Sequence, residues 1–165
     1  MPTSPRLART FAVTSCAWFL FALDRLSVTT ALPTIRSDLG ADLVGAEWTV
    51  NAYTLAFALL LIGGAALGDR FGRRRMFAVG VATFTAGSAA AASAPDVGAL
   101  VAARAVQGAG AAIFVPLAMT LLTVAIPAEH RGRALGAWGG VGGLGWFWRA
   151  SAARQHRAAA AKLVG

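Results

Sequence analysis

Charged residues and cysteines are scarce in this 165-residue chain, and each scarcity excludes a class of protein. Only 13% of the residues are charged and 57% are hydrophobic, which is far from the balance of a soluble domain. A single cysteine, Cys16, excludes an intramolecular disulfide and a cysteine-based metal cluster. The two histidines lie in polar segments, and the sequence has no glycine-rich phosphate loop after a strand and no nucleophile–base spacing. The sequence therefore predicts no enzyme, no cofactor and no metal site.

The positive charge of the chain is concentrated in short clusters at the ends of apolar runs. Its formal net charge is +8, which alone would suit nucleic acid or anionic lipid as a partner. The clustering argues against nucleic acid and for a protein embedded in the lipid bilayer. The clearest cluster, residues 68–75, lies between the apolar runs 53–67 and 76–94. Because its four arginines and one aspartate cannot lie in hydrocarbon, we predict a tight cytoplasmic loop between two membrane helices.

The apolar runs predict an all-α, polytopic transmembrane helix bundle with four full spans and a partial fifth. A crossing needs about 20 residues. Pro33 is expected to end the first span, because the residue before a proline resists helical geometry. Residues 34–46 are expected to form an external loop, after which Glu47 and Trp48 open the second span. The four predicted spans are residues 11–32, 47–67, 76–94 and 97–125.

Polar residues inside the first and fourth predicted spans are the candidate functional residues. One interpretation is that both Asp24 and Arg25 lie near the membrane boundary. The other is that Asp24 faces a polar interior and takes part in transport, which leaves the role of Arg25 undecided. In the fourth span Arg104, Gln107 and Gly108 share one helix face, because they are three and four residues apart. An arginine this far inside a membrane helix must face protein or water.

The second and fourth predicted spans each contain a further notable feature. Asn51, Tyr53 and Thr54 make the outer half of the second span amphipathic, and they either line a cavity or face the membrane interface. Pro116 is expected to kink the second half of the fourth span.

The arginines outside the spans predict the orientation of the chain in the cell membrane. Eight of them fall on one side of the predicted path and only Arg36 falls on the other. The positive-inside rule therefore predicts a multi-pass plasma-membrane protein whose N-terminus is cytoplasmic. The eight are Arg6, Arg9, Arg70, Arg73, Arg74, Arg75, Arg131 and Arg133.

The last apolar segment, residues 134–148, is the exception. It has about fifteen residues, which is short for a crossing, and a basic tail follows it. If it crossed, that tail would be external, against the charge pattern of the other loops. We therefore predict a domain of transmembrane helices over residues 1–145 and a divergent basic tail over residues 146–165, frame-shifted or disordered.

Four stretches, in order and at matching spacing, resemble motifs of the major facilitator superfamily, especially its fourteen-helix drug:proton antiporter group. The resemblance covers roughly residues 10–145. The stretches are Leu23-Asp24 with Ala31-Leu32-Pro33, Glu47-Trp48 through Tyr53-Thr54-Leu55, Leu67-Gly68-Asp69-Arg70-Phe71-Gly72-Arg73-Arg74, and Arg104-Ala105-Val106-Gln107-Gly108-Ala109-Gly110 with Pro116. The chain departs from the family pattern at Leu26, Thr29 and Ala65, and after Gly145, where antiporters carry a glycine–proline signature.

The resemblance implies roles for three groups of residues. Arg104, with Gln107, resembles the fourth-helix residues that tune protonation of a carboxylate, for which Asp24 is the available acid; a structural arginine bonded to helix carbonyls is the alternative. In the family the loop forms an ion-pair cluster that latches helix ends, although here its charges need only set topology. The loop residues are Gly68, Asp69, Arg70, Gly72, Arg73 and Arg74, and the helix-packing residues are Gly108, Gly110 and Pro116.

Two functions follow from this resemblance. The first is a proton-coupled antiporter that exports small amphipathic compounds by alternating access, with a small-molecule substrate and protons as partners. The second is a truncated, non-transporting membrane protein or pseudogene product. Because a substrate site between two halves needs the other half, transport requires a homo-oligomer or the missing C-terminal half.

Overall fold

The computed structural model is helical wherever it describes regular secondary structure. The model describes the backbone of residues 5–140 and their side chains except those of residues 5–7, 25–34, 36 and 38. The elements are α1 (Pro5–Asp38), α2 (Leu43–Phe71), α3 (Arg73–Ala92), α4 (Val97–Ala125) and the short 3-10 helix η1 (Ala128–His130). Residues 131–140 are helical as well. The predicted all-α fold class is confirmed.

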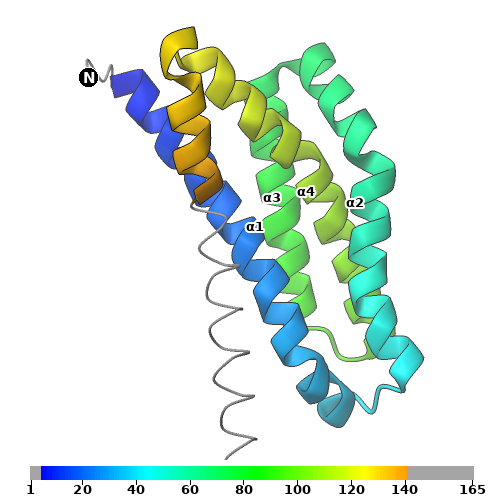
Figure 1. The fold of residues 1–165 in the computed structure, drawn as a ribbon. Coiled ribbons are helices and arrows are strands. Elements are labelled where there is room, and N and C mark those ends of the chain that lie inside the picture. The colour runs from blue at the N-terminus through cyan, green and yellow to red at the C-terminus, as the bar shows by residue number, and fades with distance from the viewer. Residues whose placement is uncertain (1–4, 141–165) are drawn as a thin grey trace, which may run out of the picture.

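Helix α4 is the centre of the bundle. It packs extensively on both α2 and α3 and makes a smaller contact with α1. The helices run alternately up and down, so that the α2–α3 turn lies at the same end as the N-terminus (Figure 1). The core around Phe114 is largely aromatic: Phe77, Phe84 and Phe21 meet its ring edge-on. Such edge-to-face contacts are the arrangement that aromatic rings prefer.

The prediction that Pro33 ends the first helix is wrong, because α1 continues through Pro33 to Asp38. A proline removes one backbone hydrogen bond, but helices in membranes tolerate this loss where neighbouring groups compensate for it. The predicted external loop, 34–46, is correspondingly too long, since only residues 39–42 separate α1 from α2. Helix α2 begins before Glu47 because Asp42 caps it, its carboxylate accepting a hydrogen bond from the Gly45 N–H at 2.7 Å.

The basic turn is also tighter than the sequence predicts. Helix α2 ends at Phe71 and α3 begins at Arg73, so Gly72 is the only residue between them. Gly72 has a φ of +94°, a conformation that side chains disfavour and glycine adopts readily. The arginines of residues 70–75 therefore belong to helix ends, and the predicted eight-residue loop is corrected to a one-residue turn.

Two described helices are long and apolar enough to cross a membrane. These are α2 and α4, each of 29 residues, and the bounds of α4 are those that the sequence predicts. Large apolar side chains also point outward from α2, where Leu59 is 79% exposed and Ile62 85% exposed. Exposed apolar surface of this kind suits lipid better than water. The other two spans, over α1 and α3, remain predictions from the sequence pattern.

The predicted fifth span falls partly outside the described residues. Residues 131–140 are helical, and Trp138 is buried with its ring stacked on that of Trp18, at a centroid distance of 4.6 Å. This stacking ties the start of the predicted span to α1. Residues 141–148 and the predicted basic tail, 146–165, lie outside the described part of the chain.

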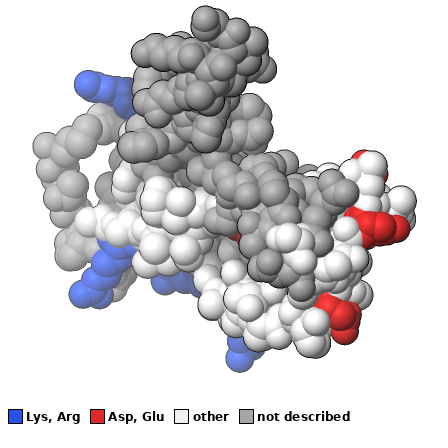
Figure 2. Space-filling view, turned by 90° about the horizontal axis from the view of Figure 1, so that it is seen from below, with Lys and Arg blue, Asp and Glu red and all other residues white. Residues whose placement is uncertain are grey.

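Charge is distributed unevenly between the two ends of the bundle. The α2–α3 turn carries Arg70, Arg73, Arg74 and Arg75. The opposite end holds the α1–α2 and α3–α4 turns, with Asp42 and Asp96 as helix caps. Figure 2 looks onto that opposite end, where acidic side chains show on the surface. The distribution agrees with the charge pattern from which the orientation was predicted.

Candidate functional site

Three polar side chains that the sequence singles out meet inside the bundle. Asp24 comes from α1, and Arg104 and Gln107 come from α4. The side chain of Arg104 is 5% exposed and that of Asp24 13%, while Gln107 is fully buried. The structure thus joins residues that are 80 and 83 positions apart in the chain.

Hydrogen bonds close these three side chains into a triangle. Nη1 of Arg104 donates to the two carboxylate oxygens of Asp24, at 2.8 and 2.9 Å, and to Oε1 of Gln107 at 2.6 Å. Nε2 of Gln107 donates to Oδ1 of Asp24 at 2.7 Å. At this separation the attraction between the two opposite charges offsets the cost of removing each from water. A single unpaired charge inside the bundle would have no such compensation. We call Asp24, Arg104 and Gln107 the polar triad.

Helix α2 completes the surroundings of the guanidinium. Nε of Arg104 donates to the backbone carbonyl of Thr49 at 3.3 Å, and its Cζ lies 4.4 Å from the centre of the Tyr53 ring. Thr49 and Tyr53 are four residues apart and both buried, so they form one face of α2. Arg104 is therefore held by a carboxylate, a carbonyl and an aromatic ring from three directions.

Thr49 is not among the site residues predicted from the sequence, and for Tyr53 the sequence leaves a cavity lining and an interfacial position open. Tyr53 is 2% exposed and packs inside the bundle, whereas Asn51 and Thr54 face outward. The contact from Thr49 is made by its backbone carbonyl, which any residue would supply. In the sequence, the four-residue spacing of Thr49 and Tyr53 indicates that they share one helix face. This spacing does not by itself predict that the face contacts an arginine.

The two glycines of the fourth-helix motif lie where α4 approaches its neighbours most closely. A Cβ on Gly108 would meet the backbone carbonyl of Tyr53 on α2, and one on Gly110 would meet the Gly80 carbonyl of α3 at 2.8 Å. Side chains at these positions would hold the helices apart, so Gly108 lets α2 reach Arg104 and Gly110 lets α3 pack closely on α4. Pro116 lies inside α4, and its carbonyl accepts a hydrogen bond from Oγ1 of Thr120 at 2.9 Å.

The residues of the α2–α3 turn are separate from the polar triad. Asp69 and Arg73 form an exposed ion pair at 2.9 Å, and Arg70 lies over the Phe71 ring at 5.4 Å. Gly68 is buried against Leu117 of α4, and Arg74 is exposed. Exposed pairs of this kind contribute about 0–1 kcal/mol. Of the predicted ion-pair cluster, the described residues show only the Asp69–Arg73 pair.

Metal ligands are not gathered in the part of the chain that the structure describes. No group of three or more His, Cys, Asp or Glu side chains there is placed to hold a metal ion. The polar triad consists of a carboxylate paired with a guanidinium and a carboxamide.

Replacing Tyr53 by leucine is expected to lower the melting temperature of the purified protein by about 2–4 °C through the lost cation–π contact, in addition to the loss from packing. The contact term requires the charge of Arg104, so it should vanish when Tyr53→Leu is made in an Arg104→Gln background. Tyr53→Phe keeps the ring and should keep the contact. Thermal unfolding in detergent measures the unaltered chain and these variants, and an equal loss from Tyr53→Leu in both backgrounds would show that Tyr53 acts by packing alone.

Comparison with known proteins identifies the family. The family model of the Major Facilitator Superfamily matches residues 14–148, and the chain belongs to this family of membrane transporters. It is 47% identical to the cephamycin export protein CmcT of Amycolatopsis lactamdurans over 130 residues, which are 78% of this chain and 27% of the relative. It is 42% identical to the puromycin resistance protein pur8 of Streptomyces alboniger over 142 residues, which are 86% of this chain and 28% of the relative.

A third relative has a similar character. The tetracenomycin C resistance and export protein of Streptomyces glaucescens is 44% identical over 124 residues, which are 75% of this chain and 23% of the relative. The chain spans about a quarter of the length of these curated relatives. The resemblance inferred from the four motifs is therefore confirmed at the level of the family, and the relatives are named as exporters and resistance proteins.

Proposed function

We propose that the chain forms the proton-coupling part of an antiporter that exports small amphipathic compounds, such as antibiotics, against proton entry. The observation that carries this proposal is the buried carboxylate of Asp24, held by Arg104 and Gln107 between α1 and α4. The names of the relatives, which are exporters and resistance proteins, support the substrate class.

Protonation of Asp24 changes the contact between α1 and α4. The neutral carboxyl loses its Coulomb attraction to Arg104, and its protonated oxygen becomes a donor, so that the other oxygen is left as the main acceptor for the guanidinium. Arg104 keeps its contacts to Thr49 and Tyr53 on α2, so the cation stays with α2 and α4. Because α1 packs on α4 less extensively than α2 and α3 do, α1 is the helix that loses most when the pair breaks.

This arrangement supports alternating access as the mode of transport. In the charged state the polar triad fastens α1 to α4, and in the protonated state α1 is freer to move against the other helices. A bound proton therefore biases the bundle toward one of two arrangements, which is what coupling between ligand binding and conformation requires. A basic substrate would compete with Arg104 for the same carboxylate, so that proton and substrate occupy Asp24 in turn.

The proposal also includes the orientation of the chain in the membrane and the helices that complete its substrate site. We place the N-terminus and the arginines of the α2–α3 turn at the cytoplasmic face of the cell membrane. The substrate site of such transporters lies near the midplane between two halves. Helices α1 to α4 supply one wall of that site, and further helices or a second copy of the chain supply the other.

A resistance assay tests the proposed function. The segment of the puromycin resistance protein of Streptomyces alboniger that matches this chain is replaced by the chain's own residues, and puromycin resistance is measured in a sensitive bacterium. We expect the chimera to confer resistance, and Asp24→Asn or Arg104→Ala to reduce it to the level of cells without a transporter. Glu47→Gln, which removes an exposed carboxylate outside the triad, should leave resistance unchanged.

Expression of the chain alone, with efflux of a fluorescent cation as the readout, shows whether a second copy can supply the missing wall. A chimera that inserts into the membrane without conferring resistance would contradict the proposed transport function. If the Asp24→Asn chimera still confers resistance, the chain transports the compound but Asp24 is not required for transport.

A further inference from the structure

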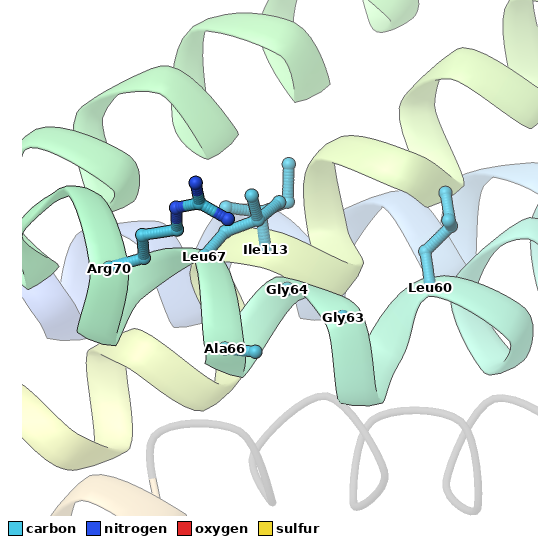
Figure 3. A pocket seen from close by; sticks show the side chains of 7 residues that line it. All are labelled: Leu60, Gly63, Gly64, Ala66, Leu67, Arg70 and Ile113. Atoms are coloured by element: carbon cyan, nitrogen blue, oxygen red, sulfur yellow. The ribbon is translucent and has the colours of Figure 1, made fainter.

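Glycines join three helices of the bundle by close contact of their backbones. Gly64 of α2 lies against the backbone of Ala112 and Ile113 of α4, and Figure 3 shows Gly64 beside Ile113. On α3, a Cβ at Gly80 or Gly87 would lie 2.8 Å from a backbone nitrogen of α4. Small residues at such contacts let helices in a membrane pack closely. We call α2, α3 and α4 the glycine-packed helices.

Helix α1 is attached to the glycine-packed helices in a different way. It contains no glycine, and it packs on α4 less extensively than α2 and α3 do. Its described polar contact with these helices is the polar triad. Its ring contacts with them are those of Phe21, which meets Phe57 at a tilt and Phe114 edge-on, at centroid distances of 6.0 and 6.4 Å. Side-chain contacts of this kind can rearrange when a helix shifts, so α1 is the helix best able to move.

The helix that follows η1, residues 131–140, is attached to α1 by a stack of two tryptophans. The rings of Trp18 and Trp138 lie 4.6 Å apart with an interplanar angle of 23°, and Trp138 is buried. Of the described ring contacts between α1 and another helix, this is the one in which the rings lie face to face. Nε1 of each indole is buried and makes no hydrogen bond with the described residues. The Trp18–Trp138 pair can therefore move without breaking a hydrogen bond to the glycine-packed helices.

Phe21 connects the Trp18–Trp138 pair to the polar triad. It lies three positions after Trp18 and three before Asp24, so both are its neighbours on the surface of α1. Its ring is stacked on that of Trp18, at a centroid distance of 5.2 Å and an interplanar angle of 12°. Rigid helices and packed side chains carry a conformational change from one place to another. A displacement of Asp24 is therefore passed along α1 to Trp18 and its partner.

The charged groups around Asp24 determine what makes α1 respond to pH. Within the described residues, Arg104 of α4 is the charged side chain that faces this carboxylate. Helix α2 contributes the carbonyl of Thr49 and the ring of Tyr53, both of which contact Arg104. The basic residues at the start of the next helix are exposed. A movement of α1 on acidification would therefore originate at Asp24.

We propose that α1 and residues 131–140 move as one unit against the glycine-packed helices when Asp24 takes up a proton, and that the Trp18–Trp138 pair holds this unit together. The inference rests on the proposed function, in which protonation of Asp24 frees α1 from Arg104. Trp18 and Trp138 are positioning residues, because they contact neither the proton nor the substrate and determine which helix follows α1. Proton coupling by Asp24 does not itself require this, since α1 could move alone.

Distances between spin labels, measured by double electron–electron resonance on the purified chain in nanodiscs, test this movement. The reference label is at Leu59→Cys, an exposed position of α2. The second label is at the native, exposed Cys16 of α1, at the exposed Ala137→Cys, or at the exposed Val79→Cys of α3. The last two pairs are made in a Cys16→Ser background. Each distance is measured at acidic and at alkaline pH, and again with Asp24→Asn.

We expect acidification to change the Leu59–Cys16 and Leu59–Ala137 distances together, each by at least about 2 Å, the scale on which packed helices shift. The Leu59–Val79 distance should stay constant, because both labels are on glycine-packed helices. With Asp24→Asn, the first two distances should have their acidic values at both pH values, because the side chain is always neutral.

Substitutions of Trp138 test whether the stack is the link. Trp138→Ala should leave the pH response at Cys16 and remove the response at Ala137. Trp138→Phe keeps an aromatic ring that can stack on Trp18 and should restore the response. Trp48→Ala is the matched control, because it removes an exposed tryptophan of α2 outside the pair, and it should leave both responses unchanged.

A Leu59–Ala137 distance that stays constant while the Leu59–Cys16 distance changes would overturn the inference and leave the proposed function in place. A response at Ala137 that survives Trp138→Ala would show that the stack is not the link. A Leu59–Val79 change as large as the others would overturn the division into two units. Absence of a response at Cys16 would overturn the movement, while puromycin resistance of the chimera tests the proposed function separately. If Trp138→Ala does not fold, the Leu59–Ala137 distance of the unaltered chain decides.

Discussion

Replacing Arg104 by alanine is expected to lower the free energy of unfolding by about 3–5 kcal/mol, the cost of removing one partner of a buried ion pair. The substitution leaves the carboxylate of Asp24 inside the bundle with only the Gln107 amide as a donor among the described contacts. It also opens the space that the guanidinium fills between Thr49 and Tyr53. Thermal unfolding of the purified protein in detergent, followed by circular dichroism, measures the loss.

The second substitution Asp24→Asn is the control for Arg104→Ala. An asparagine is neutral, so the double variant has no unpaired charge and should recover a large part of the stability that Arg104→Ala loses. Recovery of this kind separates the electrostatic cost from the loss of packing around the arginine. A double variant as unstable as Arg104→Ala would contradict the ion pair as the source of the stability.

Replacing Gly108 by valine is expected to destabilise the protein by about 3 kcal/mol, at the upper end of the usual cost of overpacking. The added Cβ would meet the backbone carbonyl of Tyr53, and neither backbone can yield as a flexible side chain would. The two helices must separate, which moves the Tyr53 ring away from Arg104. Thermal unfolding measures the effect, and transport by the chimera should be lost together with stability.

Gly63→Val is the matched control for Gly108→Val. It makes the same change in a helical glycine, but among the described residues a Cβ at this position would meet nothing within 4 Å. Any effect of helix propensity is therefore shared by the two variants, and only the steric effect differs. Equal destabilisation by the two substitutions would show that close approach of α2 and α4 at Gly108 is unimportant.

The pairing of Arg104 with Gln107 was predictable from sequence because it depends on spacing within one helix. Residues three positions apart on an apolar helix share a face, and a buried arginine requires a partner. Asp24 was the acid available inside a predicted span, and the structure places it against both residues. An unpaired charge inside a membrane costs so much free energy that the few buried charges are expected to pair with each other. Their pairing can therefore be predicted from the sequence.

The contribution of α2 was not predictable in the same way. Thr49 acts through a backbone carbonyl and Tyr53 through the face of its ring, and neither contact is encoded by a complementary charge. The helix ends were missed for similar reasons. The cap formed by Asp42 and the continuation of α1 through Pro33 depend on local geometry that outweighs the general preferences of these residues.

We propose that Asp24 carries the proton that drives export, and proteoliposomes containing the chimera provide the test. Puromycin accumulation driven by a pH gradient is compared with puromycin exchange, which needs no net proton movement. We expect Asp24→Asn to abolish accumulation driven by the pH gradient and to retain exchange, because the neutral side chain resembles the protonated state and cannot release a proton. Puromycin accumulation driven by the pH gradient that persists in Asp24→Asn would show that Asp24 does not carry the proton.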